Sequence, residues 1–168
     1  NMRPLTVFAM ETYAKDPGKY FIPRNPNMVK LSKHDSELWA KMHKAISIIQ
    51  FKLEGQLIKR QPEFHMDNHL MLDNIDFVTG TITIEGKKYM LRDHNFPTIN
   101  HVRQYELKQA ENELMELLRS SFLHSEKLQR HIRFIYNKGS TYLNINNNLL
   151  YHGSITLKHD GSFHAVIQ

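Results

Sequence analysis

The chain has 168 residues, with 22 lysines and arginines against 17 aspartates and glutamates, which gives a formal charge of +5. The sequence contains no cysteine, so disulfides and thiolate metal sites are excluded. No apolar run approaches the roughly 20 residues that cross a bilayer, and the first residues lack the apolar core of a secretory signal. These features predict a cytoplasmic, globular protein without a membrane partner.

The positive charge is spread along the chain rather than gathered into one block. No run of five basic residues occurs, and there is no aromatic and arginine motif typical of an RNA-binding sheet. We therefore expect no nucleic-acid partner, although the diffuse charge leaves binding to an acidic partner open.

Four stretches have the three- and four-residue spacing of apolar side chains that predicts helices: residues 4–14, 36–62, 105–122 and 126–138. The stretch 36–62 has the widest apolar stripe, so we expect it to form the centre of the core. Ser32 or Ser36 is expected to cap it, and Ser125 is expected to cap residues 126–138 up to Gly139. Residues 17–31 contain three prolines and predict an irregular connection.

Alternating apolar and polar residues around short turn sequences predict β-hairpins. One surrounds Glu85-Gly86, a second surrounds Asn146-Asn147, and a third surrounds Asp160-Gly161. The sequence therefore predicts an α+β fold that is mainly helical, with two or three hairpins.

Three groups of residues are candidates for chemistry. His65 and His69 are four residues apart, a spacing that suits either a metal clip or surface histidines. Arg130, His131 and Arg133 form either a solvated helix face or a cation cluster for an anionic substrate. His152 ends the apolar strand 149–151 and precedes Gly153, a position that suits either a metal ligand at a sheet rim or a structural histidine.

Several long blocks resemble the class III (Firmicutes-type) fructose-1,6-bisphosphatases. They are KMHKAISIIQFKLEGQLIKRQPEF at 41–64, SFLHSEKLQRHIRFIYNKGSTYL at 121–143 and NNLLYHG at 147–153. The opening MRPLTVFAMETY at 2–13 is similar as well.

The resemblance implies hydrolysis of fructose 1,6-bisphosphate to fructose 6-phosphate and phosphate, a step of gluconeogenesis. It also implies a calcineurin-like metallophosphatase core with manganese, in which two metals bridge the phosphate and activate water. The ligand motifs of the types GDxH, GDxxDRG, GNH[DE] and the final GH do not occur in this sequence. His152 corresponds to a later histidine ligand, and no catalytic residue can be assigned. The isolated chain is therefore expected to be an inactive segment of the enzyme.

The resemblance also implies a domain organisation. Residues 1–139 would form a mainly helical insertion, or cap, with a hairpin near 80–92, and residues 140–168 would return to the sheet of the metallophosphatase domain. The alternative is a non-enzymatic helical interaction module that binds an acidic partner or nucleic acid. Assembly into a homo-oligomer is left open.

Overall fold

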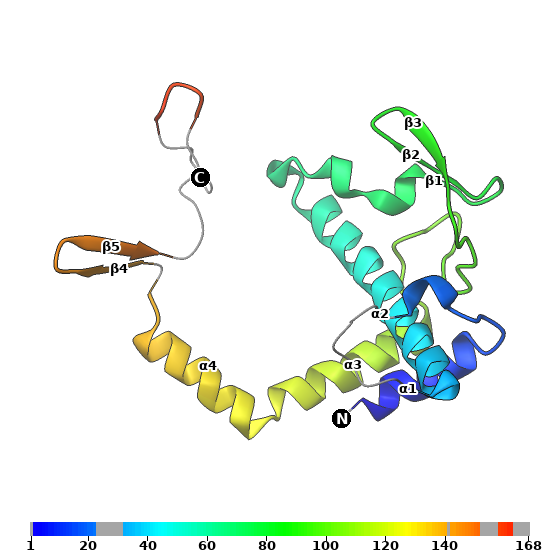
Figure 1. Cartoon of the computed structure of the whole chain (residues 1–168), viewed down its shortest axis with the longest axis horizontal. Helices are drawn as coiled ribbons and strands as arrows, with labels where there is room; N and C mark the ends of the chain where they lie inside the picture. Colours follow the sequence, from blue (N-terminus) through cyan, green and yellow to red (C-terminus); the bar gives the residue numbers. More distant parts are fainter. Residues whose placement is uncertain (1, 23–31, 141, 152–157, 163–168) are drawn as a thin grey trace. The chain divides into compact units, whose positions relative to one another are not determined.

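The computed structural model of the chain describes residues 2–22, 32–140, 142–151 and 158–162. It divides into two compact units, Asn1–Ser121 and Phe122–Gln168, called unit 1 and unit 2 below. Helices dominate and the strands are short and antiparallel, which confirms the α+β, mainly α class (Figure 1). None of the helices in the described ranges is long and apolar enough to cross a membrane.

The helix α2 (Lys33–Arg60) is the centre of unit 1, as the sequence predicted. Of the two candidate caps, Ser32 is the one used, because its side chain accepts a hydrogen bond from the Asp35 amide. The helix ends in Lys59 and Arg60, whose charges complement the negative end of the helix dipole. Figure 1 shows α1 (Arg3–Thr12) beside its first half.

Two apolar clusters cover α2 at different levels. The first joins α1 and α3 (Gln109–Leu123) to the helix; its buried members are Leu5, Phe8, Ala9, Tyr13, Ala45, Ile49 and Leu114. The second joins the segment that follows α2; its buried members are Ile48, Ile58, Leu70, Leu72, Ile99 and Tyr105. The first helix and its buried side chains therefore agree with the predicted helix 4–14.

The start of α3 differs from the prediction of a helix from residue 105. Tyr105 is 7% exposed and packs in the second cluster. Its carbonyl accepts a hydrogen bond from Gln56 Nε2 at 2.7 Å, so its backbone is held by α2. The helix begins at Gln109, where Glu111 Oε2 accepts the Lys108 amide at 2.8 Å and satisfies one of the free amides near the helix start.

The expected hairpin in unit 1 is confirmed and gains a third strand. β2 (Thr81–Ile84) and β3 (Lys87–Met90) pair on either side of Glu85 and Gly86, whose φ angles are 49° and 76°. β1 (Ile75–Asp76) pairs with β2 as the third strand.

Short 3₁₀ turns lie between the main elements of unit 1. Lys19–Phe21 lies between α1 and α2, and Pro62–Phe64, Asp67–His69 and Met71–Asn74 lie between α2 and β1.

Unit 2 has the predicted elements but no buried side chain among the residues described. The helix α4 (Glu126–Lys138) begins after Ser125, which accepts the Leu128 amide, and ends at Gly139, as expected. The apolar pattern of residues 126–138 predicts that Ile135 is buried, but this side chain is 64% exposed, so that prediction is wrong. β4 (Tyr142–Ile145) and β5 (Asn148–Tyr151) form the second hairpin. At the third, the turn at Asp160-Gly161 is seen, while its flanking strands fall outside the described residues.

Candidate functional site

The predicted metal ligand, His152, lies outside the described residues. It follows Tyr151, the last residue of β5, which pairs with Tyr142 of β4. Its assignment as a metal ligand therefore stays a prediction.

The histidine pair near residue 65 does not share a helix. His65 ends the 3₁₀ turn Pro62–Phe64 with a φ of 51°, and His69 belongs to the separate turn Asp67–His69. Within the part of the chain that the structure describes, no three His, Asp or Glu side chains lie close enough to hold a metal ion. These residues alone do not fit a manganese centre.

A buried polar cluster that was not predicted from the sequence surrounds Lys44, a fully buried residue of α2. Its Nζ lies 2.5 Å from Asp16 Oδ2 and 2.7 Å from Asp93 Oδ2. Asn95 Nδ2 donates to Asp16 Oδ2 at 3.0 Å, and the Gly18 amide donates to Asp16 Oδ1 at 2.8 Å. One cation is therefore shared by carboxylates from two segments that are distant in sequence.

Burial opposes ionisation of Asp16, but the hydrogen bonds from Lys44 and the Gly18 amide outweigh it. The pKa of this carboxyl is consequently held below its usual value. A hollow of about 210 Å³ adjoins the cluster, with Lys19, Arg92 and His94 among its lining residues. Because both carboxylates already bind Lys44, the arrangement suits a structural ion pair better than a general base.

A second missed cluster surrounds Lys52, two turns further along α2. Its Nζ lies 2.6 Å from Glu111 Oε2 and donates to the Thr98 carbonyl at 2.8 Å. The pKa of Lys52 is lowered by burial, against the opposing effect of Glu111. The cluster holds α3 and the preceding loop on α2.

Three buried polar atoms around this second cluster have no hydrogen-bond partner within the described ranges: the Tyr13 hydroxyl, Thr98 Oγ1 and Glu111 Oε1. Burial raises the pKa of Tyr13 well above its usual range, so the phenol is neutral at physiological pH. One feature of the sequence could have indicated the two clusters. Lys44 and Lys52 each lie four residues from the buried Ile48, so both lysines are on the buried face of α2.

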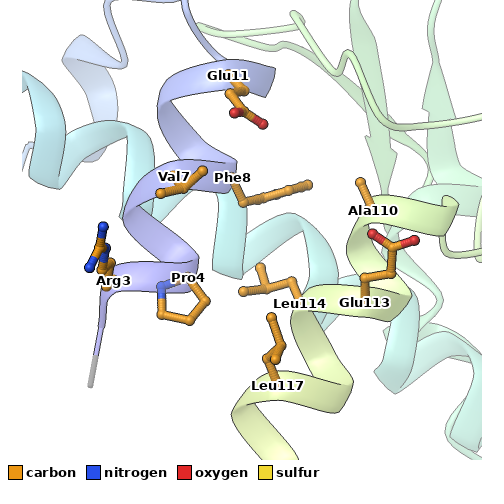
Figure 2. Close-up of a pocket in the computed structure, with 9 residues that line it drawn as sticks. All are labelled: Arg3, Pro4, Val7, Phe8, Glu11, Ala110, Glu113, Leu114 and Leu117. Carbon is orange, nitrogen blue, oxygen red and sulfur yellow. The ribbon is translucent and has the colours of Figure 1, made fainter.

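A groove of about 400 Å³ lies between α1 and α3 (Figure 2). Phe8 and Leu114 are its buried residues, and Val7 and Leu117 are 47% and 57% exposed. Figure 2 shows Arg3 and Glu11 at opposite ends of the α1 side of the groove. Its apolar lining offers no nucleophile or metal ligand set, and we assign no chemistry to it.

The cation cluster predicted on α4 has a different membership from the one expected. A hollow of about 630 Å³ is lined by Lys127, Arg130, Arg133 and Glu126. His131 is not among the lining residues, because it is displaced by about 100° around the helix from Arg130. The cation cluster therefore consists of Lys127, Arg130 and Arg133, and His131 is not part of it.

The comparisons with known proteins give one consistent result. The sequence profile described as Firmicute fructose-1,6-bisphosphatase matches residues 1–168. Three curated proteins called fructose-1,6-bisphosphatase class 3 match over 166 residues, or 99% of the chain. They come from Clostridium tetani, Alkaliphilus metalliredigens and Clostridium novyi, at 55%, 52% and 51% identity.

The matched region covers 25% of each of these relatives, so the chain spans about a quarter of their length. No solved structure matches the chain.

Proposed function

The chain belongs to the Firmicute fructose-1,6-bisphosphatase family, and from this premise we propose that it is a segment of an enzyme hydrolysing fructose 1,6-bisphosphate. The products are fructose 6-phosphate and phosphate, and the reaction serves gluconeogenesis in the cytoplasm. The observation that carries the proposal is the 55% identity to a class 3 enzyme over 99% of the chain.

The hairpin β4–β5 supports a place for unit 2 within a longer protein. Side chains alternate between the two faces of a strand, so the pairing divides the hairpin's apolar residues between both faces. One face has Tyr142, Leu149 and Tyr151, and the other has Leu143, Ile145 and Leu150. All six are between 48% and 60% exposed.

An antiparallel hairpin at a protein surface normally has one apolar face. Two apolar faces favour a hairpin covered on both sides, as in the sheet of a larger domain. We propose that residues 140–168 join a calcineurin-like metallophosphatase sheet formed with the rest of the longer protein, and that residues 1–139 form an insertion beside it.

We propose manganese as the cofactor of the full-length enzyme, with His152 as one ligand. When bound, the metal would supply a Lewis acid and an activated water. The described residues hold no complete ligand set, and we propose that the remaining ligands come from other parts of the longer protein. The 168-residue chain alone is expected to be inactive.

The direct test measures phosphate release from fructose 1,6-bisphosphate with manganese, for both the full-length protein and the 168-residue chain. We expect release by the full-length protein only. An inactive full-length protein would refute the proposed activity, and release by the short chain above the metal-only control would refute the segment assignment.

The role of His152 is tested separately by the variant His152→Ala in the full-length protein. We expect a lower manganese content, measured by elemental analysis, together with a loss of activity. The matched control is His124→Ala, which replaces a histidine directly after the end of α3 that has no predicted metal role. Normal metal content in the His152 variant would remove it from the ligand set.

A further inference from the structure

The two sides of α4 have opposite character. Leu128 and Ile132 are half-buried on one side of the helix. Lys127, Arg130 and Arg133 surround the hollow of about 630 Å³ and are spaced three residues apart, which makes them neighbours on a helix surface.

The charges of these three side chains are not compensated as those of Arg103 and Arg119 are. Arg103 lies 3.1 Å from Glu106, and Arg119 lies 3.3 Å from Glu116. By contrast, no salt bridge to Lys127, Arg130 or Arg133 occurs within the described ranges. Among the described residues, Glu126 is the one carboxylate that lines the hollow, against three cations.

This set of side chains matches the chemistry of a phosphate group. A guanidinium presents planar pairs of N–H donors that fit phosphate oxygens, and a lysine adds a point charge. Arg133 Nε also donates to the Gln129 carbonyl at 3.3 Å, which restrains the guanidinium along the helix. Two arginines and a lysine around one hollow therefore form a candidate binding site for a phosphate dianion.

The substrate of the proposed reaction has two phosphates, and only one of them is hydrolysed. The other must be recognised by groups that bind without reacting. In the sequence, Tyr142 follows the end of α4 by four residues, and it pairs with Tyr151, the residue before the predicted metal ligand His152.

We propose that Lys127, Arg130 and Arg133 bind the 6-phosphate of fructose 1,6-bisphosphate, the phosphate that remains on the product. This inference rests on the proposed function and assigns these three residues to substrate specificity. In this proposal, Lys127, Arg130 and Arg133 make the enzyme bind a sugar bisphosphate more tightly than a monophosphate ester.

The test uses the full-length enzyme and the variants Arg130→Gln and Arg133→Gln, singly and together. Loss of a charge-assisted hydrogen bond is expected to raise KM for fructose 1,6-bisphosphate about tenfold in each single variant, with kcat nearly unchanged. The inhibition constant of fructose 6-phosphate should rise by a similar factor, because this product keeps the 6-phosphate. The kcat/KM for a monophosphate ester that has no second phosphate should not change.

Two controls separate binding from a general effect on the fold or the charge. Arg119→Gln removes one exposed, ion-paired arginine of α3 and is expected to leave KM unchanged. Arg130→Lys keeps the charge without the planar fork and should have an intermediate KM.

The possible failures are distinguishable. If the unmodified enzyme does not hydrolyse fructose 1,6-bisphosphate, the proposed function is wrong. If it is active and the double variant keeps the KM and the fructose 6-phosphate inhibition constant of the unmodified enzyme, only the assignment of α4 is wrong. An equal loss of kcat/KM for the monophosphate ester would also overturn it, because the cations would then serve the reacting phosphate.

Discussion

Gly55 lies where α2 and Tyr105 come closest, and replacing it with alanine tests the packing of the second apolar cluster. A Cβ at this position would lie 2.0 Å and 2.1 Å from two carbons of the Tyr105 ring. Ordinary contacts begin near 3.4 Å, so the ring would have to move by roughly 1.4 Å. Its hydroxyl accepts the Asp73 amide at 3.2 Å and its carbonyl accepts Gln56 Nε2, which restrict that movement.

Two opposing effects set the magnitude of the change. Overpacking a filled core costs about 1–3 kcal/mol, and the restrained ring of Tyr105 favours the upper end of this range. Alanine is better than glycine in a helix by about 1 kcal/mol. We therefore expect Gly55→Ala to lower the free energy of unfolding by about 2 kcal/mol.

The assay is urea unfolding of the 168-residue chain, followed by circular dichroism at a helical wavelength. Tyr105→Ala provides the decisive background, because it removes every ring atom that the new methyl group would meet. In that background Gly55→Ala should become stabilising by about 1 kcal/mol. A stabilising effect in the unmodified chain, or the same effect in both backgrounds, would refute the packing argument.

The remaining predictions concern the buried ionisable groups of unit 1. Lys44→Met should lower the free energy of unfolding by about 3–5 kcal/mol, since it leaves two carboxylates unpaired, whereas Lys33→Met on the same helix should change it little in the same urea assay. The pKa of Asp16 is lowered in the folded state, so the ionised carboxylate stabilises the fold above the ordinary carboxyl pKa, and this stabilisation is lost as the pH falls through the folded pKa. The free energy of unfolding should therefore decrease between pH 5 and pH 2, and this decrease should be smaller in Asp16→Asn. Burial raises the pKa of Tyr105 to about 12 in the folded state. The tyrosine ionises first in the unfolded state, so the free energy of unfolding should decrease between pH 9 and pH 12. Tyr105→Phe should make this decrease smaller.

The ends of the helices were predictable wherever a local signal sets them. Ser125 and Gly139 enclose α4 as expected, and the Asn146-Asn147 turn adopts the φ angles of 51° and 61° that asparagine tolerates. These features depend only on neighbouring residues in the sequence, so the types of those residues are enough to predict them.

Features that depend on tertiary contacts were not predictable in this way. Tyr105 continues the apolar pattern of α3 but is drawn into the core against Gly55, so the helix starts later. Lys44 and Lys52 were not recognised as buried, because their carboxylate partners come from segments up to 59 residues away.

The candidate site was predicted less completely than the fold. The resemblance identified the family, but it assigned a single residue, His152, which the described residues do not include. The sequence predicted a cation cluster of Arg130, His131 and Arg133, whereas the hollow on α4 is lined by Lys127 together with the two arginines. The predicted division at residues 139 and 140 stays a prediction.

The shared ion pair of Lys44 has a consequence for how this family can diverge. Asp16 and Asp93 meet the same ammonium group, although 77 positions separate them in the sequence. A substitution that removes the cation leaves the buried Asp16 and the half-buried Asp93 without a counter-charge, and one that removes an acid leaves the cation partly uncompensated. Relatives that lack a basic residue at position 44 should therefore have neutral residues at both 16 and 93, and the three positions are expected to change together.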